Sequence, residues 1–246
     1  MRNSNNTIVR QFWSHVNNMP DNTGFYARNV ISHLETTIVP IMSPVTGGSV
    51  YTVNAPLYRE ISWLQAGHIV AEAMIFLKEI GFKKGDRAAI LAWNSPEWVW
   101  LDLAIKSLGG TTVPIYPNSA GDQVNYILGD SGCKILFTDD QEQMKKVSVE
   151  SGVRSYYFNH VLADTIDYDG SKMNKEDVGY KSRNLTPTNR SQTLVRTILS
   201  QLVVGGRLND NFLGIKPQDL ATLIYTSGST GQPKGVIQLH STIASA

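Results

Sequence analysis

A run of glycines, hydroxyl side chains and one lysine stands near the carboxyl end of this chain of 246 residues. It reads YTSGSTGQPKGV, from Tyr225 to Val236. Glycine lets successive backbone N–H groups converge on an anion, and small hydroxyls add donors with little bulk. A lysine ammonium is a mobile positive charge that can pair with a terminal phosphate. These residue types predict a loop that binds polyphosphate.

The predicted phosphate donors are the following residues: Thr226, Ser227, Gly228, Ser229, Thr230, Gly231 and Lys234. A flexible Gly/Ser linker is the alternative interpretation. Against it, an apolar run leads directly into the stretch, Pro233 limits its freedom, and apolar residues follow it. The spacing fits neither G-x-x-x-x-G-K-[ST] nor G-x-G-x-x-G, since Pro233 precedes Lys234 and Gly235 follows it. A kinase, a GTPase or a Rossmann dehydrogenase is therefore not predicted.

Strand and helix patterns alternate upstream of the loop. Short apolar runs predict strands at Arg87–Trp93, Thr111–Tyr116, Lys134–Asp139, Val153–Phe158 and Leu220–Thr226. Start and stop signals predict helices from Ser62 to Gly81, from Ser95 to Gly109, from Ser119 and Asp122 through Leu128, and over residues 191–204. Strand, helix and strand in succession predict an α/β fold of parallel βαβ layers with helices on both faces.

The domain organisation predicted from these patterns has two parts. Residues 1–60 are expected to be irregular, with β-like runs at 36–42 and 48–53. Residues 61–246 are expected to form the α/β unit, interrupted by a polar, lysine-rich excursion at about 164–190. Pro114 should weaken the hydrogen-bond ladder of its strand.

Composition narrows the function classes. A net charge of +1 argues against nucleic-acid binding, which requires a strongly basic face. The single cysteine, Cys133, leads into an apolar run and is expected to be buried in a protein of the reducing cytoplasm. No apolar window reaches the ~18 residues of a membrane span, although contact with a membrane surface stays open. The histidines show no metal-ligand spacing, and His240 is expected at a helix start or in packing more than near a substrate.

The sequence of this loop also resembles that of a known protein family. DLATLIYTSGSTGQPKGV closely resembles the signature phosphate loop of the AMP-forming adenylating enzymes, which include acyl-CoA synthetases, luciferases and the adenylation domains of peptide synthetases. Residues 81–140 resemble the N-terminal subdomain of this family, and its long-chain fatty acyl-CoA ligases in particular. The resemblance covers about 51–140 and 215–240, and Ser229 stands where many members carry threonine.

The resemblance implies a two-step ligase with ATP, Mg²⁺ and coenzyme A. A fatty acid would be adenylated and then transferred to the coenzyme A thiol, with Lys234 in the catalytic site. In the family, the adenine pocket, the magnesium glutamate and the catalytic C-terminal domain follow the loop, so we expect an N-terminal fragment without complete activity. Two alternatives stay open, a ligase that loads acyl-AMP onto a carrier protein and a non-catalytic truncated module. A homodimer is compatible with the sequence.

Overall fold

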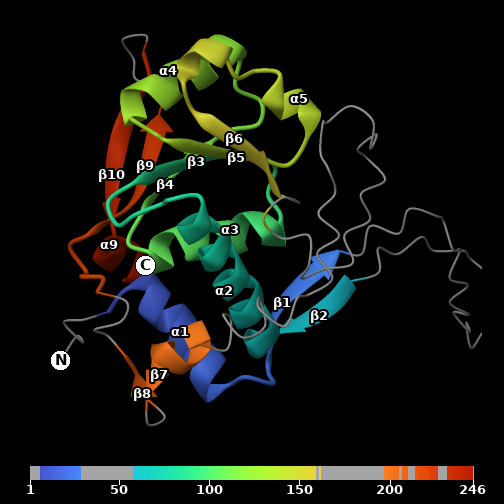
Figure 1. The fold of residues 1–246 in the computed structure, drawn as a ribbon, viewed down its shortest axis with the longest axis vertical. Helices are drawn as coiled ribbons and strands as arrows, with labels where there is room; N and C mark the ends of the chain where they lie inside the picture. Colours follow the sequence, from blue (N-terminus) through green and yellow to red (C-terminus); the bar gives the residue numbers. More distant parts are fainter. Residues whose placement is uncertain are drawn as a thin grey trace, which may run out of the picture.

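The computed structural model describes residues 6–28, 58–158, 161, 197–204, 207–209, 214–226 and 232–245. Its centre is a six-stranded sheet in the order β10-β9-β4-β3-β5-β6 (Figure 1). The strands are β3 (Arg87–Leu91), β4 (Thr111–Ile115), β5 (Ile135–Thr138), β6 (Arg154–Tyr157), β9 (Leu220–Thr226) and β10 (Lys234–Leu239). All neighbouring strands are parallel except β9 and β10, which pair antiparallel at one edge. The predicted α/β fold with a parallel sheet is confirmed.

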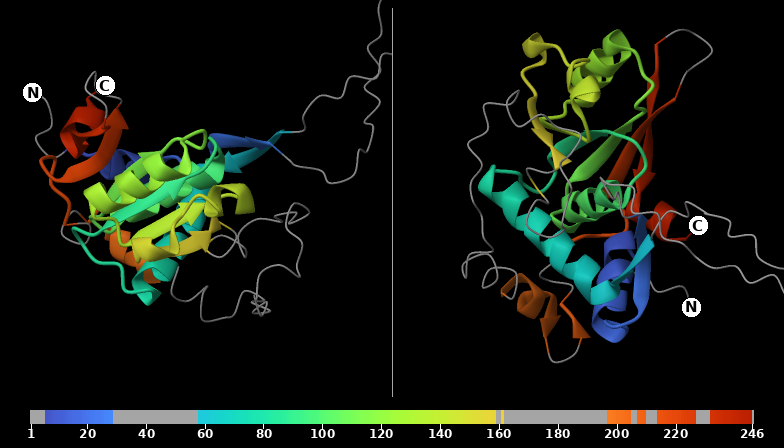
Figure 2. Two further views of the ribbon diagram at one scale, coloured as in Figure 1. Left: turned by 90° about the horizontal axis from the view of Figure 1, so that it is seen from above. Right: turned by 90° about the vertical axis from the view of Figure 1, so that its right-hand side faces the viewer.

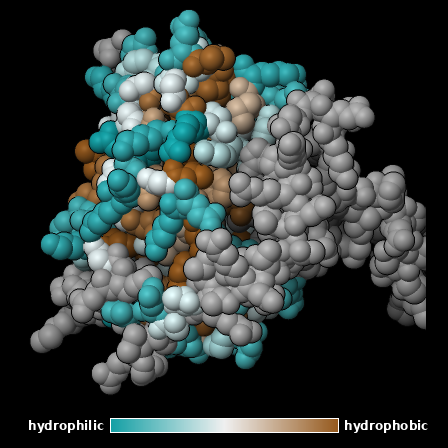
Figure 3. All heavy atoms as spheres, in the orientation of Figure 1, coloured by the Kyte–Doolittle hydropathy of each residue, from teal (hydrophilic) through white to brown (hydrophobic). Residues whose placement is uncertain are grey.

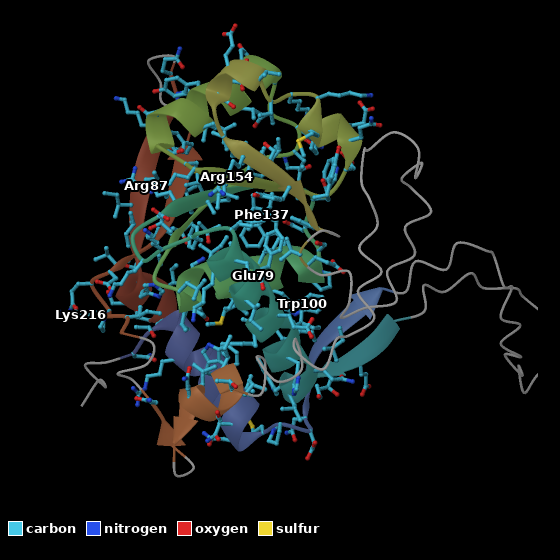
Figure 4. All side chains as sticks on the ribbon, viewed as in Figure 1. Glu79, Arg87, Trp100, Phe137, Arg154 and Lys216 are labelled. Atoms are coloured by element: carbon cyan, nitrogen blue, oxygen red, sulfur yellow. The ribbon has the colours of Figure 1, made fainter. Side chains whose placement is uncertain are left out.

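Helices cover both faces of the sheet (Figures 1 and 2). On one face lie α2 (Trp63–Glu79) and α3 (Pro96–Ser107), and on the other lie α4 (Gly121–Ser131) and α5 (Gln141–Met144). Successive side chains of a strand point to opposite faces. Ile90 of β3 therefore joins the core under α2 and α3, whereas its neighbour Leu91 joins the core under α4. Figure 4 shows Phe137 between the sheet and α2.

The ends of α2 follow its sequence signals. The Ser62 hydroxyl accepts a hydrogen bond from the Gln65 backbone N–H, and the Gln65 side chain accepts one from the Ser62 N–H, which completes the predicted capping box. At the other end Gly81 has a φ of +82°, and the Phe82 N–H donates to the Leu77 carbonyl. The left-handed stop that the sequence predicts is confirmed.

The prediction that Ser119 and Asp122 open the third helix is wrong in detail. Helix α4 begins at Gly121, and its N-cap residue, Ala120, makes no side-chain hydrogen bond to the helix. The Ser119 N–H donates instead to the Tyr116 carbonyl, which closes a turn after β4. This turn, and not a cap, directs the chain from the sheet into α4.

The prediction of an irregular N-terminal region is wrong for two segments. Residues Ile8–Asn18 form helix α1, and β1 (Thr23–Arg28) pairs antiparallel with β2 (Tyr58–Ser62). The buried side chains of α1 recur at helical spacing: Val9, Phe12, Trp13 and Val16. The many asparagines of this region hide that pattern. The β-like runs at 36–42 and 48–53 and the excursion at 164–190 lie outside the described residues.

The remaining described segments are short. Residues 197–202 are helical, but the helix predicted over 191–204 stops there, because Val203–Val204 forms β7 and pairs with β8 (Arg207–Leu208). A 3₁₀ turn, η1, covers Val149–Ser151, and the last helix is α9 (His240–Ala244). Among the residues described, none of the helices combines the length and apolar character that a membrane crossing requires.

Candidate phosphate-binding site

The predicted phosphate loop connects β9 to β10, which is an edge strand of the sheet. Thr226 is the last residue of β9, Lys234 is the first residue of β10, and the two are direct partners in the antiparallel register. The pairing therefore fixes both ends of the loop next to each other. The loop donors predicted between them, Ser227–Gly231, lie outside the described residues.

Thr226 and Lys234 both have exposed side chains. Nothing among the described residues is hydrogen-bonded to the Lys234 ammonium or forms an ion pair with it. Other lysines of the described chain do have carboxylate partners, which are Asp219 for Lys84, Asp102 for Lys106 and Asp86 for Lys134. The Lys234 side chain thus presents an uncompensated positive charge beside a threonine hydroxyl, which suits a solvent-accessible anion.

Strand β9 is anchored on its α4 face just before the loop. The Tyr225 hydroxyl donates to Asp130 Oδ2 of α4 over 2.5 Å. Burial, together with this hydrogen bond and the Asp130 charge, raises the pKa of Tyr225, so the phenol stays protonated and remains a donor. This contact ties the carboxyl end of β9 to a core helix and so steadies the start of the loop.

Gly235, the last glycine of the quoted stretch, has a packing role. It lies in β10 opposite Tyr225, and a Cβ at this position would be 3.0 Å from Leu223 Cδ1 and 3.3 Å from Tyr225 Cζ. A Cβ contact of 3.0 Å is too close without a shift of the neighbouring side chain. The glycine after Lys234 therefore lets β10 pack closely against Leu223 and Tyr225 of β9.

The loop runs from strand to strand. In a Walker loop a helix starts directly behind the phosphate, and its N-terminal N–H groups face the anion. Here the residue behind the loop begins β10, and α9 starts only at His240. This loop therefore lacks the helix N-terminus that stands directly behind a Walker loop.

The donor types at this site suit phosphate better than metal. Hydroxyls and an ammonium donate hydrogen bonds, whereas Mg²⁺ is bound through oxygen ligands such as carboxylates, phosphates and water. Within the described ranges no group of three or more His, Cys, Asp or Glu residues could hold a metal ion. The described residues of this site thus offer donors for phosphate and no cluster of ligands for a metal ion.

His240 follows the site closely but is enclosed. Its side chain is 0% exposed, its backbone N–H donates to the Asp219 carbonyl over 3.1 Å, and its ring nitrogens have no hydrogen-bond partner among the described residues. Burial, with the nearby Lys106 charge, lowers the pKa of His240 to about 4. The interpretation of His240 as a packing residue at a helix start is confirmed. Cys133 is also buried as predicted, and burial raises the pKa of its thiol to about 11.

Two exposed aromatic residues follow the carboxyl ends of β3 and β4, at the end of the sheet where β9 enters the loop, and were not singled out from the sequence. Trp93 follows β3 and is 52% exposed, and Tyr116 follows β4 and is 80% exposed. Their position directly after buried strands is the signal that could have identified them, because ligands of open α/β sheets bind beyond the carboxyl ends of strands.

Comparison with known proteins identifies the family of the chain. The family model for AMP-binding enzymes matches residues 47–246. Long-chain-fatty-acid–CoA ligase FadD15 of Mycobacterium bovis is 31% identical over 179 residues, covering 73% of this chain and 26% of that protein. Fatty acyl-CoA synthetase A of Dictyostelium discoideum is 27% identical over 189 residues, covering 76% of this chain and 26% of that protein. The chain thus spans about a quarter of the length of these relatives.

Solved structures show the same fold at low sequence identity. The N-terminal subdomain of NpsA from Klebsiella oxytoca matches with a TM-score of 0.58 and 18% identity, over 98% of this chain and 44% of that one. The fatty acyl-adenylate ligase from L. pneumophila, in complex with acyl adenylate and pyrophosphate, matches with a TM-score of 0.57 and 19% identity, over 95% of this chain and 30% of that one. With the family model covering most of its length, the chain belongs to the AMP-binding enzymes, the superfamily of AMP-forming adenylating enzymes.

Proposed function

We propose that this chain forms the polyphosphate-binding part of an AMP-forming long-chain fatty acid–CoA ligase. The observation that carries the proposal is the pairing of Thr226 with Lys234, which places at the two ends of the glycine-rich loop a hydroxyl and an ammonium that has no partner among the described residues. The two relatives compared above are named as a fatty acid–CoA ligase and a fatty acyl-CoA synthetase. Their names favour coenzyme A over a carrier protein as the acyl acceptor.

The proposed reaction has two steps. A carboxylate oxygen of the fatty acid attacks the α-phosphorus of ATP, and the bond from that phosphorus to the bridging oxygen of the β-phosphate breaks. Pyrophosphate leaves with the bonding electron pair, and acyl-AMP remains. The thiol of coenzyme A then attacks the acyl carbon, loses its proton, and AMP leaves as the thioester forms.

The residues of the loop act on the first of these steps. Negative charge grows on the departing pyrophosphate, so donors fixed around its oxygens lower the barrier more than they stabilise bound ATP. The Thr226 hydroxyl and the Lys234 ammonium would supply two of them, and the loop residues Ser227, Gly228, Ser229, Thr230 and Gly231 would supply the rest. Bound Mg²⁺ would neutralise further phosphate charge.

The experiment that tests this proposal removes the Lys234 charge. Lys234→Ala should weaken binding of ATP and of pyrophosphate by about 1.5–3 kcal/mol, the usual contribution of a hydrogen bond to a charged group. Because the side chain is exposed, the fold should be unaffected. Isothermal titration calorimetry of both variants with each ligand measures the loss.

Lys216→Ala is the matched control. Lys216 is also exposed, but it precedes β9 and so lies at the opposite end of that strand from Thr226 (Figure 4). We expect its removal to leave both affinities unchanged. Equal weakening in the two variants would indicate general attraction between lysines and phosphate, and no weakening in Lys234→Ala would remove Lys234 from the site.

A further inference from the structure

Tyr116 follows β4, the strand next to β9 on the side away from β10, and so lies near the pair formed by Thr226 and Lys234. Strands β4 and β9 are parallel neighbours, and their register pairs Thr112 with Thr222. The two backbones stay close together over the length of β4. Tyr116 is the first residue after β4, and continuing the same register by four residues would bring it level with Thr226 at the carboxyl ends of the two strands. Thr226 is in turn opposite Lys234.

All three side chains belong on one face of the sheet. Side chains alternate along a strand, and residues paired in register share a face. Tyr116 lies four residues after Thr112, and Thr226 lies four residues after Thr222, the partner of Thr112. An even spacing along a strand keeps side chains on one face, so Tyr116 and Thr226 are expected on the same face. Lys234 shares the face of its own partner, Thr226. Tyr225 is the neighbour of Thr226 in β9 and so points to the other face, where its hydroxyl donates a hydrogen bond to Asp130 of α4.

The backbone around Tyr116 is held firmly while its side chain is free. Its neighbours Ile115 and Pro117 are buried, its carbonyl accepts the Ser119 N–H over 2.9 Å, and the Lys146 ammonium donates to the Pro117 carbonyl. The Tyr116 side chain is nevertheless 80% exposed. The turn therefore fixes the position of the Tyr116 backbone, and the exposed ring and hydroxyl are accessible to a ligand.

We propose that Tyr116 is a further ligand-binding residue of the phosphate site, with its phenolic O–H donating a hydrogen bond to a phosphate oxygen of the nucleotide. The inference rests on the proposed function, because that function provides the polyphosphate. Pro114 contributes to the arrangement: it has no N–H to donate to a neighbouring strand, and beyond Thr112–Thr222 no further register pair joins β4 to β9 in the described structure. The space between Tyr116 and Thr226 is thus not closed by ladder hydrogen bonds.

The test is Tyr116→Phe, which removes one oxygen and keeps the ring. Calorimetry with MgATP and, separately, with pyrophosphate should show affinity lower by about tenfold or more for both ligands, since a hydrogen bond to a charged acceptor is lost. Tyr126→Phe on α4 is the matched control, because Tyr126 packs in the core on the other face of the sheet. It should bind both ligands like the unaltered chain.

The outcomes separate this inference from the proposed function. If Lys234→Ala weakens binding but Tyr116→Phe does not, the role of Tyr116 is wrong and the proposed function stands. If Tyr116→Ala weakens binding while Tyr116→Phe does not, the ring and not the hydroxyl is used, and the inference fails. A loss seen with ATP but not with pyrophosphate also overturns it, because the contact would then be with the AMP part of the nucleotide and not with the pyrophosphate part that the loop is proposed to hold. If the unaltered chain binds neither ligand, both proposals fail together.

Discussion

His240 is a neutral base enclosed beside a buried cation. The groups that face it are Lys106 and Asp102 of α3 and Asp219 before β9, and burial is the main reason that its pKa falls to about 4. An unfolded chain would take up the proton near the ordinary value of 6.5. Between these two values the unfolded state therefore binds more protons than the folded state, and stability must fall as the pH is lowered.

We expect the free energy of unfolding to drop by about 3 kcal/mol through His240 as the pH falls from about 6.5 to about 4. Urea titrations at several pH values should show this slope in the unaltered chain and a reduced slope in His240→Gln. His15→Gln, which removes a partly exposed histidine from α1, serves as the comparison. A slope that persists in His240→Gln would assign the acid sensitivity to other groups.

At the scale of elements, α1 packs closely against α2. A Cβ placed on Gly67 of α2 would be 2.7 Å from Val16 Cγ1 and 3.4 Å from Trp13 Cζ3, both on α1. The Trp13 indole N–H also donates to the Ser107 hydroxyl of α3 over 3.0 Å. Helix α1 is therefore fixed between two core helices, and the glycine permits that approach.

Gly67→Ala should destabilise the protein by about 1–3 kcal/mol, because the added methyl group overfills a packed contact. Gly129→Ala is the contrasting change, since it adds the same methyl group to α4, where nothing lies within 4 Å of the new Cβ. There the loss of glycine freedom should stabilise the helix by about 0.5–1 kcal/mol. The midpoints of urea unfolding measure both effects, and a shift of the same sign would contradict the packing argument.

At the scale of the molecule, the first and last described helices meet. The Gln11 side-chain amide of α1 donates to the Ala244 carbonyl over 3.1 Å, and α9 lies against α1 (Figure 2). Strand β10 is an edge strand of the sheet and pairs only with β9. Two of its apolar residues are exposed, Val236 by 46% and Ile237 by 65%. Figure 3 shows hydrophobic surface at this left-hand edge of the view.

The size of the chain relative to its relatives leads to a prediction about activity. It covers 26% of the length of the Mycobacterium bovis ligase. We expect these 246 residues to bind nucleotide without forming acyl-CoA from fatty acid, ATP and coenzyme A. Chromatographic detection of the thioester, with a full-length fatty acid–CoA ligase as the positive control, measures this. Turnover above the background without protein would show that the catalytic groups are present within this chain.

The sequence by itself determined five of the six strands of the central sheet, the two ends of α2 and the position of the predicted phosphate loop. These features depend on local chemistry: Ser62 and Gln65 form a capping box within one turn, and the apolar run Leu220–Thr226 is a strand with the bounds predicted from it. The helix at Ile8–Asn18 was missed although its apolar residues recur at helical spacing, because the segment is short and asparagines flank it on both sides.

Only the tertiary structure decided which residues share the site. Lys234 is placed opposite Thr226 by antiparallel pairing of β9 with β10, and the role proposed for Tyr116 depends on the parallel register of β4 with β9. Such register depends on which strands become neighbours in the sheet, and this is set by helix crossovers and by burial of both faces. No local pattern in the sequence contains that information.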